Sequence, residues 1–166
     1  MNSPGEIKKL SEIAKPNVGI ITNIGTAHAA KFKNQRSIAK EKSDIFSFFD
    51  ETSIAIIPFE TDYYNLISKK ASQKTKQIYS FGQNKNCDFR IITRQKTVSK
   101  LMVIDKEFNF KNNQSSSNWE QNIIIILGLI RILNIKIKNI IPSIMKLTPI
   151  KAVSYTHLRA HETRHD

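Results

Sequence analysis

Residues 18–28 read VGIITNIGTAH, an apolar run that passes directly into a polar loop. The apolar part, Val18–Ile21, is typical of a short strand that is buried in a parallel sheet. The loop Thr22–His28 would then lie at the carboxyl end of this strand, where open α/β sheets bind their ligands. We therefore expect the residues that carry chemistry to lie in this loop and in the helix that follows it.

A helix is predicted before this stretch, from Pro4 to about Ala14. Its start is marked by Ser3-Pro4-Gly5-Glu6, a capping-box pattern with a proline at the first helical position. The helical spacing of its apolar residues predicts one buried face. That face would carry Ile7, Leu10, Ile13 and Ala14.

A second helix is predicted after the loop, from about Gln35 to Phe49, with Lys42 on its apolar side. Lys40 and Glu41 face elsewhere on the same helical wheel. A lysine on an apolar stripe must extend to solvent, pair with an anion or change its chemistry. The apolar stripe consists of Ile38, Ile45, Phe46 and Phe49.

Strands and helices continue to alternate along the rest of the chain. This alternation predicts an α/β fold with a mainly parallel sheet flanked by helices, and residues 89–110 alternate in a way that adds a small antiparallel hairpin region. The further predicted strands are Ser53–Pro58 and Lys76–Phe81, and the further helices are Tyr63–Ala71, Ser117 to about Leu133 and Lys138–Leu147.

Composition excludes several classes of protein. The chain has 166 residues, 40% of them hydrophobic, which is enough for the core of one ordinary domain. Its single cysteine excludes a disulfide scaffold and a zinc site with several cysteines. The longest apolar run, Ile123–Ile130, is too short to span a membrane, and the first residues show no signal peptide. We expect a cytoplasmic, monomeric protein without a membrane partner.

The formal charge of +12 leaves a second interpretation open. A basic protein attracts polyanions, so the chain could be a small basic α/β binding module without catalysis. Nucleic-acid binding is not expected, because the sequence has no arginine-rich run and no regular interleaving of basic and aromatic residues. The abundance of lysine, isoleucine and asparagine is typical of an AT-rich gene, and the product of a decaying gene is a third interpretation.

The last residues, 153–166, differ from the rest of the chain. They contain arginines where lysine dominated before, and the string resembles the translated read-through of a sequencing adaptor. We therefore expect a native part at residues 1–152 and a non-native tail at 153–166. A metal site on a helix is the alternative for this tail, because three of the four histidines lie in it at a spacing of four, His157, His161 and His165.

Several motifs resemble the ATP-dependent Mur ligases of peptidoglycan synthesis, a likeness that extends over about residues 1–151. The first of them is similar to the family member that joins D-alanyl-D-alanine to UDP-N-acetylmuramoyl-tripeptide, and those two molecules would be the substrates of the full enzyme. The motifs are Asn2-Ser3-Pro4-Gly5-Glu6-Ile7, Asn23-Ile24-Gly25-Thr26-Ala27-His28, Ala39-Lys40-Glu41-Lys42-Ser43-Asp44-Ile45-Phe46, Asn118-Trp119-Glu120-Gln121-Asn122 and Pro149-Ile150-Lys151.

The resemblance implies a partial central ATP-binding domain that uses ATP and Mg2+. His28 would be a ligand of the second magnesium ion. Lys42 would be the lysine that the family carbamylates, a catalytic residue whose carbamate supplies two hard oxygen ligands to the same ion. Asn118 and Asn122 would contact the nucleotide base, because a side-chain amide can pair with an adenine edge.

Each of these residues also has a plainer interpretation. A histidine after a strand is usually a loop or core residue, and Lys42 could simply reach solvent. Asn118 could cap its helix, and Asn122 could face water. The sequence contains no Gly-x-x-Gly-Lys-Thr type of phosphate-binding loop. We therefore expect that these 166 residues alone do not catalyse ligation.

Overall fold

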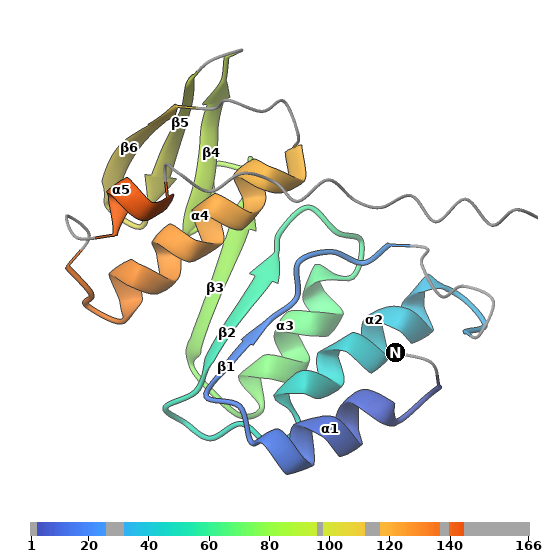
Figure 1. Ribbon diagram of the computed structural model, residues 1–166. Helices are drawn as coiled ribbons and strands as arrows, with labels where there is room; N and C mark the ends of the chain where they lie inside the picture. Colours follow the sequence, from blue (N-terminus) through green and yellow to red (C-terminus); the bar gives the residue numbers. More distant parts are fainter. Residues whose placement is uncertain (1–2, 26–31, 96–97, 112–116, 137–139, 145–166) are drawn as a thin grey trace, which may run out of the picture.

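The computed structural model describes residues 3–25, 32–95, 98–111, 117–136 and 140–144 (Figure 1). Within these ranges a six-stranded sheet in the order β1-β2-β3-β4-β5-β6 lies between helices. The strands are β1 (Val18–Ile20), β2 (Ile54–Pro58), β3 (Gln77–Gly82), β4 (Phe89–Arg94), β5 (Val98–Val103) and β6 (Lys106–Lys111). The helices are α1 (Glu6–Ala14), α2 (Gln35–Ser43), the 3-10 turn η2 (Asp44–Phe46), α3 (Tyr64–Ser72), α4 (Ser117–Ile132) and α5 (Ile141–Ile144).

The first four strands run parallel, which confirms the predicted α/β class. In β2 all five residues are buried, as expected for an inner strand that has helices on both sides. Its neighbours pair in register, with Ile56 beside Ile20 on one side and beside Tyr79 on the other. The carboxyl ends of β1, β2 and β3 therefore share one edge of the sheet.

The antiparallel part starts at this carboxyl edge. Strand β4 pairs with only the last two residues of β3, Phe81 with Phe89 and Gly82 with Arg90, and then runs on beyond it. Strands β5 and β6 add to β4 in antiparallel order. The predicted hairpin is thus a three-stranded extension, and Figure 1 shows that it continues past the end of the parallel strands.

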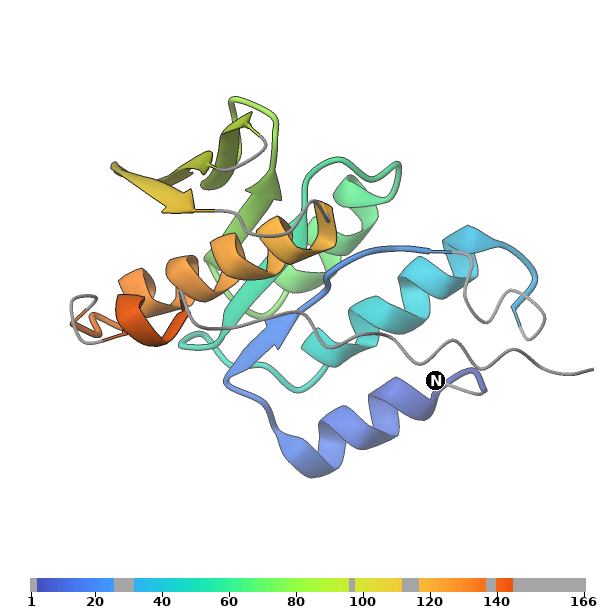
Figure 2. The ribbon, with the colours of Figure 1, turned by 45° about the horizontal axis from the view of Figure 1, so that its top comes forward.

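Side chains of alternate residues in the sheet belong to two separate cores, one on each face. Ile54 and Ile56 belong to the core that α4 covers, whereas Ala55 and Ile57 belong to the core beneath η2 and α3. The predicted stripe of the second helix is confirmed: Ile38, Phe46 and Phe49 are buried. The two cores make the molecule a three-layer arrangement of helices, sheet and helices (Figure 2).

Helix α1 starts later than its capping box predicts, at Glu6 rather than Pro4. The residue at its N-cap is Gly5, which has a left-handed backbone (φ 82°) that glycine adopts without strain. Only one half of the predicted box forms, the hydrogen bond from the Ser3 backbone N–H to the Glu6 carboxylate, at 3.3 Å. The cap comes instead from a distant residue, Glu41.

Glu41 ties α2 to the start of α1. Its carboxylate accepts the backbone N–H of Gly5 at 2.7 Å and that of Ile7 at 3.0 Å. A negative charge at a helix N-terminus is favourable, because it meets the positive end of the helix dipole and satisfies free N–H groups. The prediction that Glu41 faces away from the packed side of its helix is therefore wrong; its exposed fraction is 6%.

The predicted buried face of α1 is also wrong. Leu10 is 57% exposed and Ile13 is 82% exposed, whereas Ser11 is buried and donates its hydroxyl to the Ile45 carbonyl at 2.9 Å. The reason is the position of α1, which packs on η2 and α2 rather than on the sheet (Figure 2). A helix that rests on other helices along a narrow contact buries only one row of residues.

The remaining elements lie within a residue or two of their predicted bounds, except at the chain's end and at the second helix, which stops short of the predicted Phe49. The second helix ends in the 3-10 turn η2, and the last predicted helix is described only as α5. The predicted tail, 153–166, lies outside the described residues. None of the described helices has the length and apolarity that crossing a membrane would require.

We predict that Glu41→Ala lowers the free energy of unfolding by about 2 kcal/mol, because two part-buried N–H groups lose a charged acceptor. Urea unfolding followed by circular dichroism measures the change. Glu12→Ala is the matched control, since Glu12 is an exposed glutamate of α1, and its effect should stay within about 0.5 kcal/mol. Equal losses in the two variants would contradict the capping role.

Candidate functional site

A small pocket with both polar and apolar walls lies at the carboxyl edge of the parallel strands. Its volume is about 190 Å³, and it is formed where β1, β2 and β3 end and α4 begins. This is the position at which the sequence predicts ligand binding. The lining residues are Thr22, Asn23, Ile24, Pro58, Glu60, Thr61, Phe81 and Gln121.

Lys42 reaches this edge from α2. Its Nζ donates to the Asn23 carbonyl oxygen at 2.8 Å and lies 3.5 Å from the Asn23 side-chain oxygen. Half-burial of the side chain lowers the pKa of Lys42 from its usual value, because desolvation disfavours the ammonium form. The structure thus places the amine of the predicted stripe lysine beside the loop that follows β1.

Glu60 joins the ends of two strands. Its carboxylate accepts the backbone N–H groups of Gln83 and Asn84, each at 2.6 Å. The contact requires a glycine before them: Gly82 has a φ of 156°, and a Cβ there would lie 1.9 Å from a carboxylate oxygen of Glu60. Glu60 is not among the residues predicted for the site, although a glutamate two residues after a strand and a glycine at the end of the next strand are signals present in the sequence.

The first turn of α4 brings to the pocket a residue to which the sequence assigns no role, while the base contacts of Asn118 and Asn122 stay predictions. Gln121 lines the pocket, whereas Asn122 is exposed. The backbone of Asn118 is helical, and its side chain lies outside the described part of the structure. An amide is therefore present at the pocket wall, but it belongs to a glutamine between the two asparagines.

His28 lies outside the described residues, so its meeting with Lys42 stays a prediction. Within the described ranges, no three side chains of histidine, cysteine, aspartate or glutamate gather as a metal site. The described side chains with oxygen donors at the pocket are the carboxylate of Glu60, the amides of Asn23 and Gln121 and the hydroxyls of Thr22 and Thr61. These are hard ligands of the kind that magnesium prefers.

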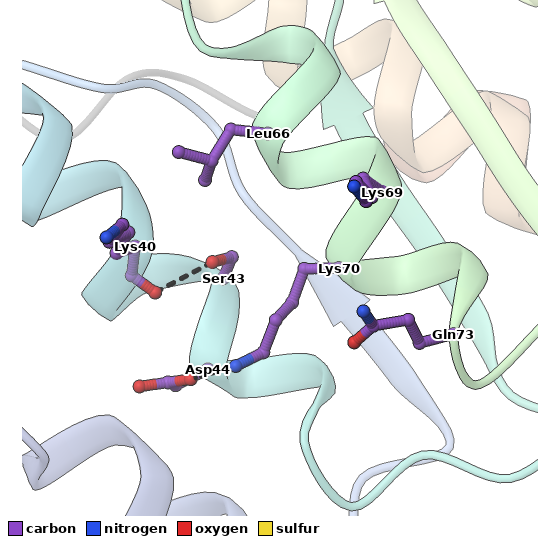
Figure 3. A pocket seen from close by; sticks show the side chains of 7 residues that line it. All are labelled: Lys40, Ser43, Asp44, Leu66, Lys69, Lys70 and Gln73. Atoms are coloured by element: carbon purple, nitrogen blue, oxygen red, sulfur yellow. Dashed lines mark hydrogen bonds and ion pairs between the residues drawn. The ribbon is translucent and has the colours of Figure 1, made fainter.

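A second, larger pocket lies between α2 and α3 (Figure 3), with a volume of about 400 Å³. It is the feature that polyanion binding would need, because Lys40, Lys69 and Lys70 line it. However, Lys70 already pairs with Asp44 at 2.6 Å. Lysines in the last turns of helices also offset the helix dipole, which explains their presence without a ligand.

The loop between β3 and β4 contains the only cysteine of the chain, Cys87, which is buried. Burial raises the pKa of the Cys87 thiol from 9.0 to about 12, and the nearby Glu60 carboxylate adds to the shift. The thiol is therefore protonated at neutral pH. Because the thiolate is the nucleophilic form, Cys87 is unsuited to nucleophilic catalysis.

Cys87 should make the stability of the protein fall at alkaline pH. The unfolded thiol ionises near pH 9.0 and the folded one near 12, so unfolding releases a proton between these values and becomes easier as pH rises. Urea unfolding at pH 8.0, 9.5 and 10.5 measures this loss. Cys87→Ala is the control, because it removes the contribution of the thiol and leaves the other titrating groups in place; identical slopes in the two proteins would contradict the prediction.

The family model and the relatives that match this chain all come from one family. A family model described as the Mur ligase middle domain matches residues 1–130. The UDP-N-acetylmuramoyl-tripeptide–D-alanyl-D-alanine ligase of Rickettsia prowazekii is 38% identical over 93 residues, which are 55% of this chain and 21% of that protein. The ligase of the same name from Treponema pallidum is 45% identical over 58 residues, or 35% of this chain and 13% of that protein.

Solved structures show the same fold. MurF from Acinetobacter baumannii aligns with a TM-score of 0.80 at 24% identity, over 91% of this chain and 33% of that one. MurF from Thermotoga maritima in complex with ADP aligns with a TM-score of 0.73 at 22% identity, over 90% of this chain and 34% of that one. The chain therefore spans about a third or less of the proteins that it matches.

Proposed function

The chain belongs to the Mur ligase family, and we propose on this basis that residues 1–152 are part of the central ATP-binding domain of a UDP-N-acetylmuramoyl-tripeptide–D-alanyl-D-alanine ligase. Residues 153–166 are then a non-native tail. The full enzyme would act in the cytoplasm as a monomer, on the way to peptidoglycan. The first motif, Asn2-Ser3-Pro4-Gly5-Glu6-Ile7, supports this member of the family over its sister enzymes.

The contact between Lys42 and Asn23 is the observation that carries the proposal. It brings a half-buried amine to the loop at the carboxyl edge of the sheet, at 2.8 Å from a backbone carbonyl. A solvated lysine would gain little from this position, whereas an amine with a lowered pKa can react with carbon dioxide. In that reaction the Nζ lone pair forms a bond to the carbon and the nitrogen loses a proton, which leaves a carbamate anion.

The carbamate of Lys42 and the imidazole of His28 would be ligands of the second Mg2+. The oxygen donors at the pocket suit this ion, as Asn23 and Glu60 illustrate. When bound, Mg2+ would offset the negative charge on the phosphoryl oxygens of ATP. In the proposed mechanism, α2 holds the Lys42 side chain at the loop. The helix is itself held in place by its buried stripe and by the contact of Glu41 with α1.

The nucleotide base would lie near the first turn of α4. The sequence assigns Asn118 and Asn122 to base contact, and Gln121 at the pocket wall offers a third amide. In the full enzyme, phosphoryl transfer from ATP to the tripeptide carboxylate would form an acyl phosphate. The amine of D-alanyl-D-alanine would attack its carbonyl carbon, and phosphate would leave as the amide bond forms.

Polyanion binding without catalysis is the second candidate function. It rests on the lysines of the pocket between α2 and α3 (Figure 3). The family membership and the position of Lys42 favour the ligase.

Carbamylation of Lys42 can be measured directly. With 13C-labelled bicarbonate at pH 8, the protein should show one carbamate carbon resonance, which weakens on acidification because the amine must be neutral to react. Lys42→Arg should remove this resonance. Lys40→Arg is the matched control, because Lys40 is an exposed lysine of the same helix and the resonance should persist. A resonance that survives in Lys42→Arg, or is absent from the unmodified protein, would contradict the assignment.

The purified 166-residue chain should not catalyse the reaction by itself, because its sequence has no phosphate-binding loop of the Gly-x-x-Gly-Lys-Thr type. Release of inorganic phosphate in the presence of ATP, Mg2+, UDP-N-acetylmuramoyl-tripeptide and D-alanyl-D-alanine is the measurement. A substrate-dependent rate above the background without protein would show that the expectation is wrong.

A further inference from the structure

A buried carboxylate in the first turn of α4 has no part in the proposed chemistry. Glu120 is 2% exposed and pairs with two groups of the antiparallel strands. It accepts a hydrogen bond from the hydroxyl of Ser99 on β5, which is fully buried, and forms an ion pair with the guanidinium of Arg94 on β4. A carboxylate at this depth is costly unless it is paired, so its partners indicate a specific role.

The isoleucines that follow Glu120 do little to fix the rotation of the first turn of α4; the close packing that constrains the helix lies two turns further along, where a Cβ at Gly128 would lie 2.4 Å from the ring of Phe89. Four consecutive isoleucines, Ile123–Ile126, are followed by Leu127, so the helix is apolar around most of its circumference. Of these five residues, all except Ile126 are buried. Apolar contacts are non-directional, and side chains of equal size can exchange places if the helix turns. Fixing a register of this kind is the best-attested use of a buried polar contact.

The position of Glu120 connects this contact to the pocket. Consecutive residues of an α-helix point about 100° apart, so Glu120 and Gln121 face different neighbours. Glu120 faces β4 and β5, which extend past the carboxyl edge of the sheet, and Gln121 lines the pocket at that edge. Any rotation of the first turn that breaks the Glu120 contacts also moves Gln121 away from the pocket wall.

We propose that Glu120 is a positioning residue, which locks the first turn of α4 to Ser99 and Arg94 and thereby holds the Gln121 amide at the pocket. The link from this amide to catalysis rests on the proposed function, since it requires a nucleotide in the pocket. The positioning of Gln121 by Glu120 does not depend on the proposed function. It is a property of the described residues of this chain and can be measured without substrate.

Two reporters follow the first turn directly. One is the side-chain amide of Gln121, whose 1H–15N resonances are assigned by comparison with Gln121→Glu. The other is the fluorescence of Trp119, the only tryptophan of the chain, which is half-buried beside Glu120. In Glu120→Ala, we expect the Gln121 resonances to move to the positions of a solvated glutamine and the Trp119 emission to shift to longer wavelength.

Further variants keep the test decisive if Glu120→Ala folds poorly. Ser99→Ala removes one partner and leaves the carboxylate in place, and it should move the Gln121 resonances in the same direction by a smaller amount. Glu120→Gln keeps a hydrogen-bonding group and should restore most of the Gln121 position. Glu107→Ala is the charge-matched control, because Glu107 forms an exposed ion pair with Lys100 in the same sheet and should leave both reporters unchanged.

Ile130→Val tests whether Glu120 merely stabilises the fold. This variant weakens the packing of α4 ten residues away from the Glu120 contact. This variant should lower stability and leave the Gln121 resonances unchanged. Unmoved Gln121 resonances in both Glu120→Ala and Ser99→Ala would overturn the inference, as would an equal shift in Ile130→Val. Titration of the unmodified protein with ADP is a separate test. Gln121 resonances that do not move on addition of ADP would count against the nucleotide function. The variants would still show whether Glu120 positions Gln121.

Discussion

The complete burial of β2 is the constraint on which the rest of the structure depends. A strand with no exposed residue needs a helical layer on each face and a paired strand at each side. Its alternate residues supply both cores, Ile56 on the α4 side and Ile57 on the α3 side. With both faces covered by helices, the open ends of the strands are the places where a ligand can approach the sheet, and the pocket lies at the carboxyl ends.

Three glutamates then fix what apolar packing leaves undetermined. Glu41 holds α1 to α2, Glu60 holds the end of β2 to the turn after β3, and Glu120 holds α4 to the antiparallel strands. Each carboxylate accepts hydrogen bonds from groups that are distant in sequence. Such bonds are directional, so they define the relative rotation and position of elements that burial alone would allow to slide.

Each of these contacts supports an element that carries a residue at or near the pocket. The Glu41 cap steadies the helix that carries Lys42, Glu60 lines the pocket itself, and Glu120 precedes Gln121 at its wall. In the proposed ligase, the elements that would bind the metal and the nucleotide are thus held in position by separate polar contacts. Substitutions at Glu41 and Glu120 should therefore affect the site, although neither residue lines the pocket.

Local pattern in the sequence was enough to predict the order of the elements and the mainly parallel class of the sheet. Apolar periodicity indicates which side of an element is buried, and it was correct for Ile38 and Phe46, which are both buried. It failed for Leu10 and Ile13, because periodicity does not show how much of an apolar face the neighbouring element covers.

Only the tertiary structure showed the roles of the three glutamates. Their partners lie 21 to 36 residues away along the chain, and no local pattern marks a carboxylate that will accept a hydrogen bond from a distant backbone N–H or hydroxyl. The same reason explains why Gln121, rather than Asn122, was found at the pocket: the rotation of α4 is set by contacts to β4 and β5, which the helix sequence does not contain. Sequence determines which groups are available, and long-range geometry decides which of them meet.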